Sequence, residues 1–260
     1  MDSDQVIVER RESVVQLVIN RPERRNALDW STLTLLHSSI EELAADKGVR
    51  AIILTGQGDR AFSSGVDLAG MGEGTSQRVL HDSRAKVAAV IQAMWAAPQP
   101  IIAKVRGYAL AGGFGLAMAA DVVIASESAV FGTPEAEVGL WPFQITVPLL
   151  RFAPPRIALE LMLTARRMDA AEALVHGLIN RVVPDEQLDA TVEAFAADLA
   201  GLSSAATGFG KRSFYQVSGS MDHEHFDYLA TLLTLVNQFD DAKEGLLARR
   251  EHRQPRFLGH

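Results

Sequence analysis

A glycine-rich turn between two apolar segments is the part of this sequence best suited to bind an anion. Residues 101–105 form a short apolar run, which predicts a buried strand. The chain then passes through the glycines of residues 107–115 into a short helical segment at residues 116–120. Unobstructed backbone N–H groups at the positive end of a helix dipole stabilise negative charge. The alternative is that these glycines only permit close helix–strand packing.

Several other chemistries lack their sequence motif. Neither G-x-G-x-x-G nor G-x-S-x-G occurs, so no Rossmann or hydrolase-elbow prediction is made. Residues 208–213 approach a P-loop, but Ala205 stands where its first glycine would be. His223 and His225 are two positions apart and do not share a helix face, so no metal site is expected.

Composition narrows the class of protein further. The 260 residues are 48% hydrophobic, enough for one large core or a core with a helical appendage. A net charge of −7 argues against a nucleic-acid-binding surface, and the absence of cysteine excludes disulfides and thiolate chemistry. With a charged N-terminus and no run of transmembrane length, we expect a cytoplasmic protein without membrane contact.

Together with residues 61–68, the glycine turn resembles the crotonase (enoyl-CoA hydratase/isomerase) superfamily. The resemblance implies an α/β fold, a spiral of repeated ββα units with a C-terminal helical segment, and a homotrimer or hexamer. We place the crotonase-like core with its CoA-thioester site at residues 1–202 and the helical oligomerisation segment at residues 203–260. Further matching segments are Asn20-Arg21-Pro22, Asn26-Ala27-Leu28, Phe131 to Glu135, Gly177-Leu178-Ile179, Val182-Val183-Pro184 and Glu244-Gly245-Leu246.

The resemblance assigns an oxyanion hole to two backbone amides, those of Val66 and Gly112. Two N–H groups converging on a thioester oxygen would stabilise the enolate formed when the α-carbon loses a proton, and such a donor is typically worth about a hundredfold to a thousandfold in rate. Val66 replaces a commoner alanine and Ala111 a usual glycine; both keep the N–H and add bulk.

The resemblance also supplies one acid/base, Glu135, which follows Phe131-Gly132-Thr133-Pro134. The position of the second glutamate of hydratases is occupied by Gly115. Addition of water benefits from two carboxyl groups, whereas one can shift a double bond, so isomerisation is slightly favoured over hydration by Glu135 alone. Acyl-CoA hydrolysis, decarboxylation and non-catalytic CoA-ester binding remain alternatives.

Coenzyme A is expected only as part of the acyl-CoA substrate, without a separate cofactor. The apolar residues 140–145 could raise the pKa of Glu135, and the Phe143 amide is expected to be a free donor. Near the C-terminus, Arg249, Arg250, Arg253 and Arg256 could meet the CoA phosphates, or they could form a solvated basic tail. The residues expected to bind substrate or CoA are Arg25, Ala27, Ser64, Gly65, Val66, Asp67, Leu68, Gly112 and Phe143.

The remaining elements are predicted from apolar periodicity. Residues 6–8 and 14–19 are expected to be strands joined by a charged turn at 9–12, and 51–54 and 122–125 are further strands. Leu33, Leu36, Ile40 and Leu43 predict an amphipathic helix capped by Asp29 or Ser31. Later helices are expected at 158–163, 170–176, 187–199, 205–215, 223–236 and 241–251.

Overall fold

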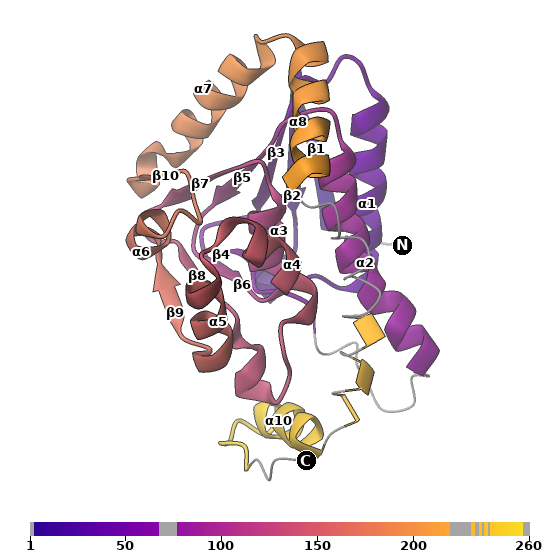
Figure 1. Cartoon of the computed structure of the whole chain (residues 1–260), viewed down its shortest axis with the longest axis vertical. Helices are drawn as coiled ribbons and strands as arrows, with labels where there is room; N and C mark the ends of the chain where they lie inside the picture. Colours follow the sequence, from indigo (N-terminus) through magenta and orange to yellow (C-terminus); the bar gives the residue numbers. More distant parts are fainter. Residues whose placement is uncertain are drawn as a thin grey trace.

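Two sheets with helices on their outer faces form the body of the protein (Figure 1). The computed structural model describes residues 3–67, 77–218, 230–231, 234–235, 237–238 and 240–256. The six-stranded sheet has the order β1-β2-β3-β5-β7-β10 and the four-stranded sheet the order β4-β6-β8-β9. The strands are β1 Val6–Arg11, β2 Val14–Ile19, β3 Ala51–Gly56, β4 Ala61–Ser63, β5 Ile101–Val105, β6 Tyr108–Leu110, β7 Val122–Ser126, β8 Val130–Gly132, β9 Arg167–Asp169 and β10 Arg181–Val183.

The helices alternate with these strands along the chain, and the described residues after β10 are mostly helical. The α-helices are α1 Trp30–Ala45, α2 Gln77–Ala96, α3 Gly112–Ala119, α4 Phe143–Phe152, α5 Pro155–Thr164, α6 Ala170–Val175, α7 Leu188–Ala200, α8 Ser204–Ser218 and α10 Asp240–Arg250. Short 3-10 turns are η1 Ser3–Gln5, η2 Pro22–Arg24, η4 Pro134–Val138 and η5 Asp185–Gln187. No helix in the described segments combines the length and apolar character needed to cross a bilayer.

The first hairpin is longer than the sequence predicts. The charged residues expected to form its turn continue strand β1, which pairs antiparallel with β2 as far as Arg11 opposite Val14. Glu12 has a φ of 55°, so the chain reverses over only two residues. Charged side chains are tolerated because most of β1 is exposed at the sheet edge.

The predicted amphipathic helix is confirmed as α1, and Asp29 is its N-cap. The Thr32 amide donates to Asp29 Oδ1 at 2.8 Å, which pairs an N–H left free in the first helical turn. The apolar stripe of Leu33, Leu36 and Ile40 is fully buried against the core.

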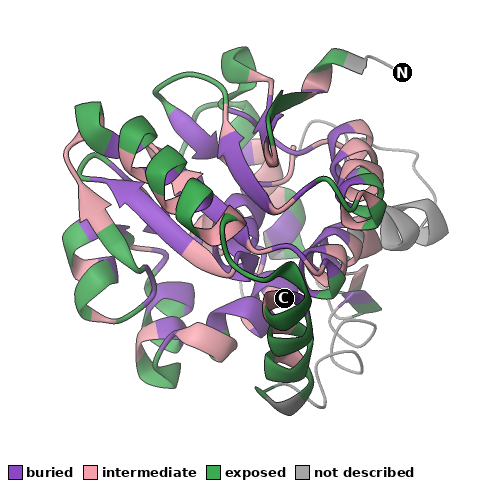
Figure 2. Ribbon diagram, turned by 90° about the horizontal axis from the view of Figure 1, so that it is seen from above, coloured by how far each residue is buried: buried purple, intermediate pink, exposed green. Residues whose placement is uncertain are grey.

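The central parallel strands β3, β5 and β7 of the six-stranded sheet are buried on both faces, as strands of parallel sheets usually are. Successive residues of β3 alternate between two clusters: Ile52 and Leu54 join the main core with α1 and α2, while Ile53 joins a smaller core beneath α7. Figure 2 shows these strands as buried ribbons between helices that are exposed on their outer sides.

Paired strands of the spiral divide between the two sheets. β3 and β4, β5 and β6, and β7 and β8 each place their first strand in the six-stranded sheet and their second in the four-stranded sheet. β6 lies within the segment expected to be only a glycine turn, because its three residues pair with β4 and β8. Helices α2 and α4 were not predicted.

The C-terminal helices dock through specific contacts. Lys211 of α8 places Nζ 2.6 Å from Asp121 Oδ2, and the Tyr215 hydroxyl donates to Asp121 Oδ1. Asp121 therefore joins α8 to the core through both of its carboxylate oxygens. Most of the helix predicted at 223–236, with His223 and His225, lies outside the described residues, and the division at residue 203 stays a prediction.

Candidate active site

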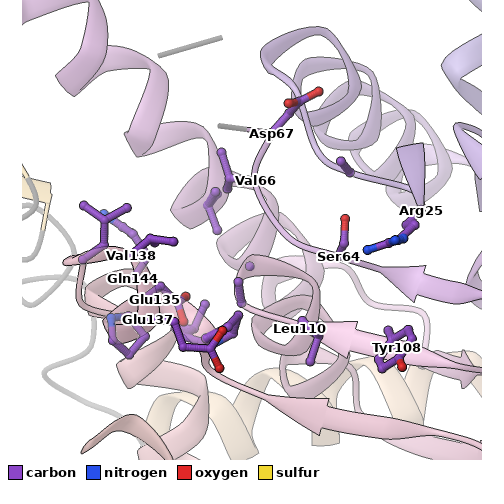
Figure 3. Close-up of a pocket in the computed structure, with 18 of the residues that line it drawn as sticks. Arg25, Ser64, Val66, Asp67, Tyr108, Leu110, Glu135, Glu137, Val138 and Gln144 are labelled. Carbon is purple, nitrogen blue, oxygen red and sulfur yellow. The ribbon is translucent and has the colours of Figure 1, made fainter. Parts of the chain in front are cut away.

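A large cavity of about 1180 Å³ opens where three strands of the four-stranded sheet end (Figure 3). β4, β6 and β8 are adjacent and parallel, so their carboxyl ends lie side by side. Val66 follows β4, Gly112 follows β6 and Glu135 follows β8. The fold thus brings together the three predicted catalytic residues, which are far apart in the sequence, and all three line the cavity.

The two predicted oxyanion donors are close neighbours. A Cβ built on Gly112 would lie 3.6 Å from the Val66 nitrogen. Gly112 begins α3, so its N–H belongs to the unpaired first turn of a helix. Within the described part of the chain, neither amide donates to a protein acceptor. The arrangement can therefore present two free N–H groups to one oxygen atom in the cavity.

Backbone strain accompanies this pair of amides. Ala111, immediately before Gly112, has φ 50° and ψ −129°, a conformation that favours glycine. Its amide donates to the Gly132 carbonyl of β8, which holds the turn against the neighbouring strand. Gly65 has a φ of 93°, and a Cβ there would lie 2.6 Å from the Ala111 Cβ and 3.1 Å from the Gly112 nitrogen. Only glycine at position 65 allows the two turns to approach.

Glu135 has the properties of a general base. It lies in η4, and although the residue as a whole is half-buried, its Oε2 is closed off from solvent and has no hydrogen-bond partner among the described residues. Burial raises the pKa of Glu135 to about 7, against smaller lowering effects of a backbone hydrogen bond and Arg167. A carboxyl group that titrates near neutral pH can both accept and return a proton.

A second carboxylate near Glu135 forms an ion pair with an arginine. Glu137 also lines the cavity, but it is exposed and forms an ion pair with Arg167 at 3.0 Å. Figure 3 shows Glu135 and Glu137 at the same side of the cavity. Of these two carboxylates, Glu137 is open to solvent, whereas Glu135 has an enclosed oxygen.

The place of the missing glutamate is filled by an aliphatic side chain. A Cβ on Gly115 would lie 2.2 Å from Cγ2 and 2.8 Å from Cβ of Ile145. Ile145, at 2% exposure, comes from the first turn of α4, which packs against α3. Position 115 therefore has no carboxylate, and the hydrocarbon side chain of Ile145 fills the space that one would need.

Most predicted binding residues line the same cavity. Arg25, Ala27, Ser64 and Asp67 do so, whereas Leu68 lies outside the described residues. The Asp67 carboxylate lies 3.3 Å from the Arg21 guanidinium. Gly65 acts through the close approach described above.

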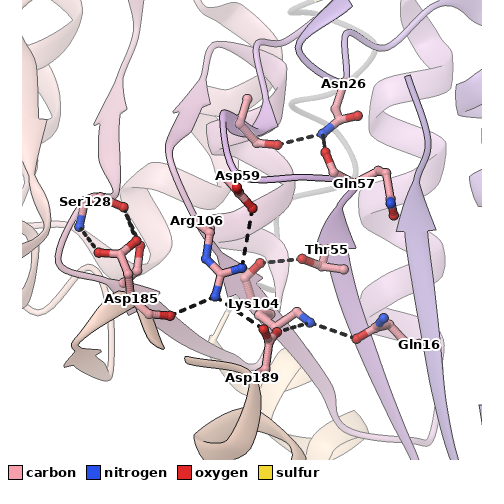
Figure 4. Close-up of polar contacts among 12 residues, drawn as sticks. Gln16, Asn26, Thr55, Gln57, Asp59, Lys104, Arg106, Ser128, Asp185 and Asp189 are labelled. Atoms are coloured by element: carbon pink, nitrogen blue, oxygen red, sulfur yellow. Dashed lines mark hydrogen bonds and ion pairs between the residues drawn. The ribbon is translucent and has the colours of Figure 1, made fainter. Parts of the chain in front are cut away.

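The loop carrying Arg25 and Ala27 is fixed by a buried asparagine. Asn26 Nδ2 donates to the carbonyl oxygens of Gln57 at 3.0 Å and Ala61 at 2.6 Å, as Figure 4 shows. Its Oδ1 accepts from the Arg21 amide at 3.0 Å. Asn26 and Arg25 both have a φ of 54°, which asparagine tolerates better than most residues. This network holds the loop next to β4.

The prediction that the Phe143 amide is a free donor is wrong. Pro142 has φ −78° and ψ 55°, the geometry of an inverse γ-turn, and the Phe143 amide donates to the Trp141 carbonyl at 2.9 Å. Phe143 still lines the cavity. It contributes surface to the cavity and no backbone hydrogen bond.

Gln144 is the functional candidate that sequence reasoning missed. It lines the cavity next to Phe143 and is only 6% exposed, and neither Nε2 nor Oε1 has a hydrogen-bond partner among the described residues. A lone amide in the otherwise apolar segment 140–145 was the available signal. Its lack of partners depends on tertiary packing and cannot be seen in the sequence.

The C-terminal arginines separate into different roles. Arg249 of α10 lines the cavity. Arg253 forms a 2.6 Å ion pair with Glu244 and a second with Glu251, so its charge is neutralised within the C-terminal segment. No group of three or more potential metal ligands occurs in the described portion of the chain.

Comparison with known proteins gives the family. The sequence model of the enoyl-CoA hydratase/isomerase family matches residues 9–260 of this chain. The crotonyl-CoA hydratase of Syntrophomonas wolfei is 34% identical, over 99% of this chain and 99% of its own length. The chain belongs to the enoyl-CoA hydratase/isomerase family. It is a crotonase-type enzyme that acts on an acyl-CoA.

Solved structures agree with this membership. The crystal structure of a carnitinyl-CoA hydratase from Mycobacterium avium has a TM-score of 0.87 and 34% identity, covering 99% of each chain. An enoyl-CoA hydratase from Mycobacterium avium subsp. paratuberculosis has a TM-score of 0.88 and 26% identity, covering 97% of this chain and 98% of its own. The sheets and helices described above therefore form the crotonase fold of the family.

Proposed function

We propose that this family member shifts a double bond in an enoyl-CoA, converting a 3-enoyl thioester into the 2-enoyl isomer. Gly115 and Ile145 carry the proposal: where a second carboxylate would act, the chain has a hydrocarbon contact. Glu135 remains as an enclosed carboxyl group with a pKa of about 7. A single carboxylate suffices for isomerisation, because the proton that it removes is the proton that it returns.

In the proposed reaction Glu135 removes a proton from C2 of the substrate. The electron pair of the broken C–H bond moves toward the thioester, and negative charge develops on the carbonyl oxygen, where the Val66 and Gly112 amides donate hydrogen bonds. The protonated Glu135 then delivers its proton to C4. The double bond now lies between C2 and C3, and neither atoms nor electrons have been added.

Matched 3-enoyl- and 2-enoyl-CoA substrates test this proposal by mass spectrometry. Isomerisation moves the double bond without a change in mass, and Glu135→Gln should reduce the rate on the order of a hundredfold or more. The Glu137→Gln variant is the matched control, because Glu137 is exposed and paired with Arg167. Turnover by Glu135→Gln at the wild-type rate would contradict the assignment.

Hydration is the second candidate, because similar proteins carry hydratase names, including the crotonyl-CoA hydratase of Syntrophomonas wolfei. Glu135 would then activate a water without a second carboxylate. Gain of one water by 2-enoyl-CoA, with no double-bond shift in 3-enoyl-CoA, would establish it. Release of free CoA or carbon dioxide would instead favour a hydrolase or decarboxylase, and binding without turnover a non-catalytic homologue.

Assembly and location belong to the same proposal. We keep a homotrimer or hexamer in the cytoplasm as the expected state, with no nucleic-acid or membrane partner. No separate cofactor is required for the proposed proton transfer, and coenzyme A takes part only as a portion of the substrate.

A further inference from the structure

Gln144 is a polar group enclosed in the cavity without any use in the proton transfer described above. Both polar atoms of its side chain are inaccessible to solvent and lack a hydrogen-bond partner among the described residues. Burying an amide in this way is unfavourable, and buried polar groups in proteins are almost always paired. Because solvent does not reach these atoms, a ligand would supply the partner by displacing the side chains that cover the amide at the cavity wall.

Most of the side chains around Gln144 are apolar, and Glu135 is the nearby carboxylate. Val138, Leu140, Trp141 and Ile145 line the same cavity, and Figure 3 draws Gln144 near Glu135 and Val138. A plain fatty acyl chain would fill this space and leave the amide unpaired. An acyl chain with a hydroxyl group would satisfy it, because a carboxamide offers both a donor and an acceptor.

We propose that Gln144 is a specificity-determining residue, and that the enzyme acts on acyl-CoA thioesters whose acyl chain carries a hydroxyl group beyond C3. The position beyond C3 rests on the proposed isomerisation, in which no water takes part. An added water would place its oxygen on C3, so the location of the hydroxyl distinguishes the substrate's own group from the oxygen of a hydration reaction.

Selectivity of this kind has a physical basis in the penalty for an unpaired group. A site built to hydrogen-bond a substrate hydroxyl rejects the analogue lacking it, because the protein group then stays buried without a partner. A single such bond gives a preference on the order of tenfold to a hundredfold. The CoA portion and the thioester are identical in both ligands, so the ratio of their dissociation constants isolates the acyl-chain contact.

Calorimetric binding of unreactive saturated thioesters tests the proposal independently of turnover. The probes are hexanoyl-CoA and its 3-, 4- and 5-hydroxy derivatives, titrated into the full-length wild type and the Gln144→Met variant. We expect the wild type to prefer the 4- or 5-hydroxy ligand by on the order of tenfold or more. Gln144→Met should lose this preference and bind hexanoyl-CoA at least as tightly as the wild type does.

A second buried glutamine gives the matched control. Gln99 is 7% exposed and lies outside the cavity; its Nε2 donates to the Leu43 carbonyl at 3.0 Å, whereas its Oε1 has no partner among the described residues. Gln99→Met should therefore destabilise the fold and leave the ligand preference unchanged. Gln144→Met removes an unpaired amide, so without ligand it should be no less stable than the wild type.

Two results would overturn the assignment. Equal preference ratios in the wild type and Gln144→Met would show that Gln144 does not contact the hydroxyl group. A preference confined to the 3-hydroxy ligand would mean that the bound oxygen is that of an added water, which favours hydration. Failure of the isomerase proposal alone would leave the binding of the 4- and 5-hydroxy ligands intact, so the two failures are distinguishable.

Discussion

Cγ2 of Ile145 lies 2.2 Å from where the Cβ of a side chain at Gly115 would be. Two atoms cannot approach so closely, so neither residue can be changed without regard to the other. In the hydratases that the sequence resembles, a glutamate stands where this chain has Gly115. Ile145 occupies the space that the side chain of such a glutamate would need, so hydrocarbon takes the place of a carboxylate.

Introducing the carboxylate should therefore require a second substitution. Gly115→Glu alone should lower the free energy of unfolding by at least roughly 1–3 kcal/mol through overpacking. Gly115→Glu with Ile145→Gly should recover part of this loss and give measurable hydration of 2-enoyl-CoA. The double variant Gly115→Glu/Ile145→Ala is the control. Alanine keeps the Cβ of residue 145, which would still lie 2.8 Å from the Cβ of Glu at position 115, so this variant should not recover the stability. If the losses of unfolding free energy of the two single variants simply add up in the double variant, residues 115 and 145 are not coupled.

Much of the fold could be predicted because apolar patterns are local. The strand at residues 101–105 and helix α1 follow from runs and periodicity within one segment. Helix α4 was missed because its apolar segment contains Pro148, which ordinarily interrupts a helix. β6 was missed because three residues between glycines become a strand only through pairing with β4 and β8.

The site was predictable where its residues have motifs and unpredictable where neighbours decide. Val66, Gly112 and Glu135 were located by resemblance, and the adjacent strand ends explain why they meet. The hydrogen bond that occupies the Phe143 amide depends on the turn at Pro142 and could not be read from residue types. The unpaired amide of Gln144 likewise exists only in the packed molecule.

The raised pKa of Glu135 should appear in the pH dependence of catalysis. The base must be deprotonated to accept a proton, so kcat/KM should rise with pH and level off above a pH of about 7. An ordinary exposed glutamate would place this transition near its usual 4.5. A wild-type profile measured with a 3-enoyl-CoA checks the value, and a flat profile through neutrality would contradict a raised pKa for the catalytic base.

The same shift should make stability depend on pH. Glu135 has a pKa of about 7 when folded and 4.5 as its ordinary value, so the folded state binds more protons between these limits. The stabilisation from protonated Glu135 is therefore fully present below about pH 4.5. As the pH rises from there through 7, the free energy of unfolding falls by roughly 3 kcal/mol. Glu135→Gln should remove this decrease in denaturant titrations, whereas Glu137→Gln should retain it.

Gly65 should be indispensable to the oxyanion site for a reason beyond its φ. Gly65→Ala would place Cβ 2.6 Å from the Ala111 Cβ and 3.1 Å from the Gly112 nitrogen, and would displace one of the two amides. We expect kcat to fall about a hundredfold or more. Gly58→Ala is the control, because Gly58 has a φ of 78° but its Cβ would meet no atom closer than 4.0 Å. Equal losses in both variants would attribute the effect to backbone strain alone.

Helix α10 should position Glu135 through backbone contact with η4. A Cβ on Gly245 would lie 2.3 Å from the carbonyl carbon and oxygen of Val138, at the end of the turn that carries Glu135. Ala242 and Leu246 on the same helix pack with Val138, and α10 lies at the lower end of Figure 1. Gly245→Ala should therefore displace η4.

We expect Gly245→Ala to lower kcat on the order of tenfold to a hundredfold with a smaller change in KM, because misplacement of the base affects the chemical step more than binding. Gly210→Ala in α8 is the matched control, since a Cβ there would meet nothing within 4 Å and alanine favours the helix. It should leave kcat unchanged and raise stability slightly. Wild-type kcat in Gly245→Ala, measured with the same 3-enoyl-CoA, would mean that α10 does not hold the base in place.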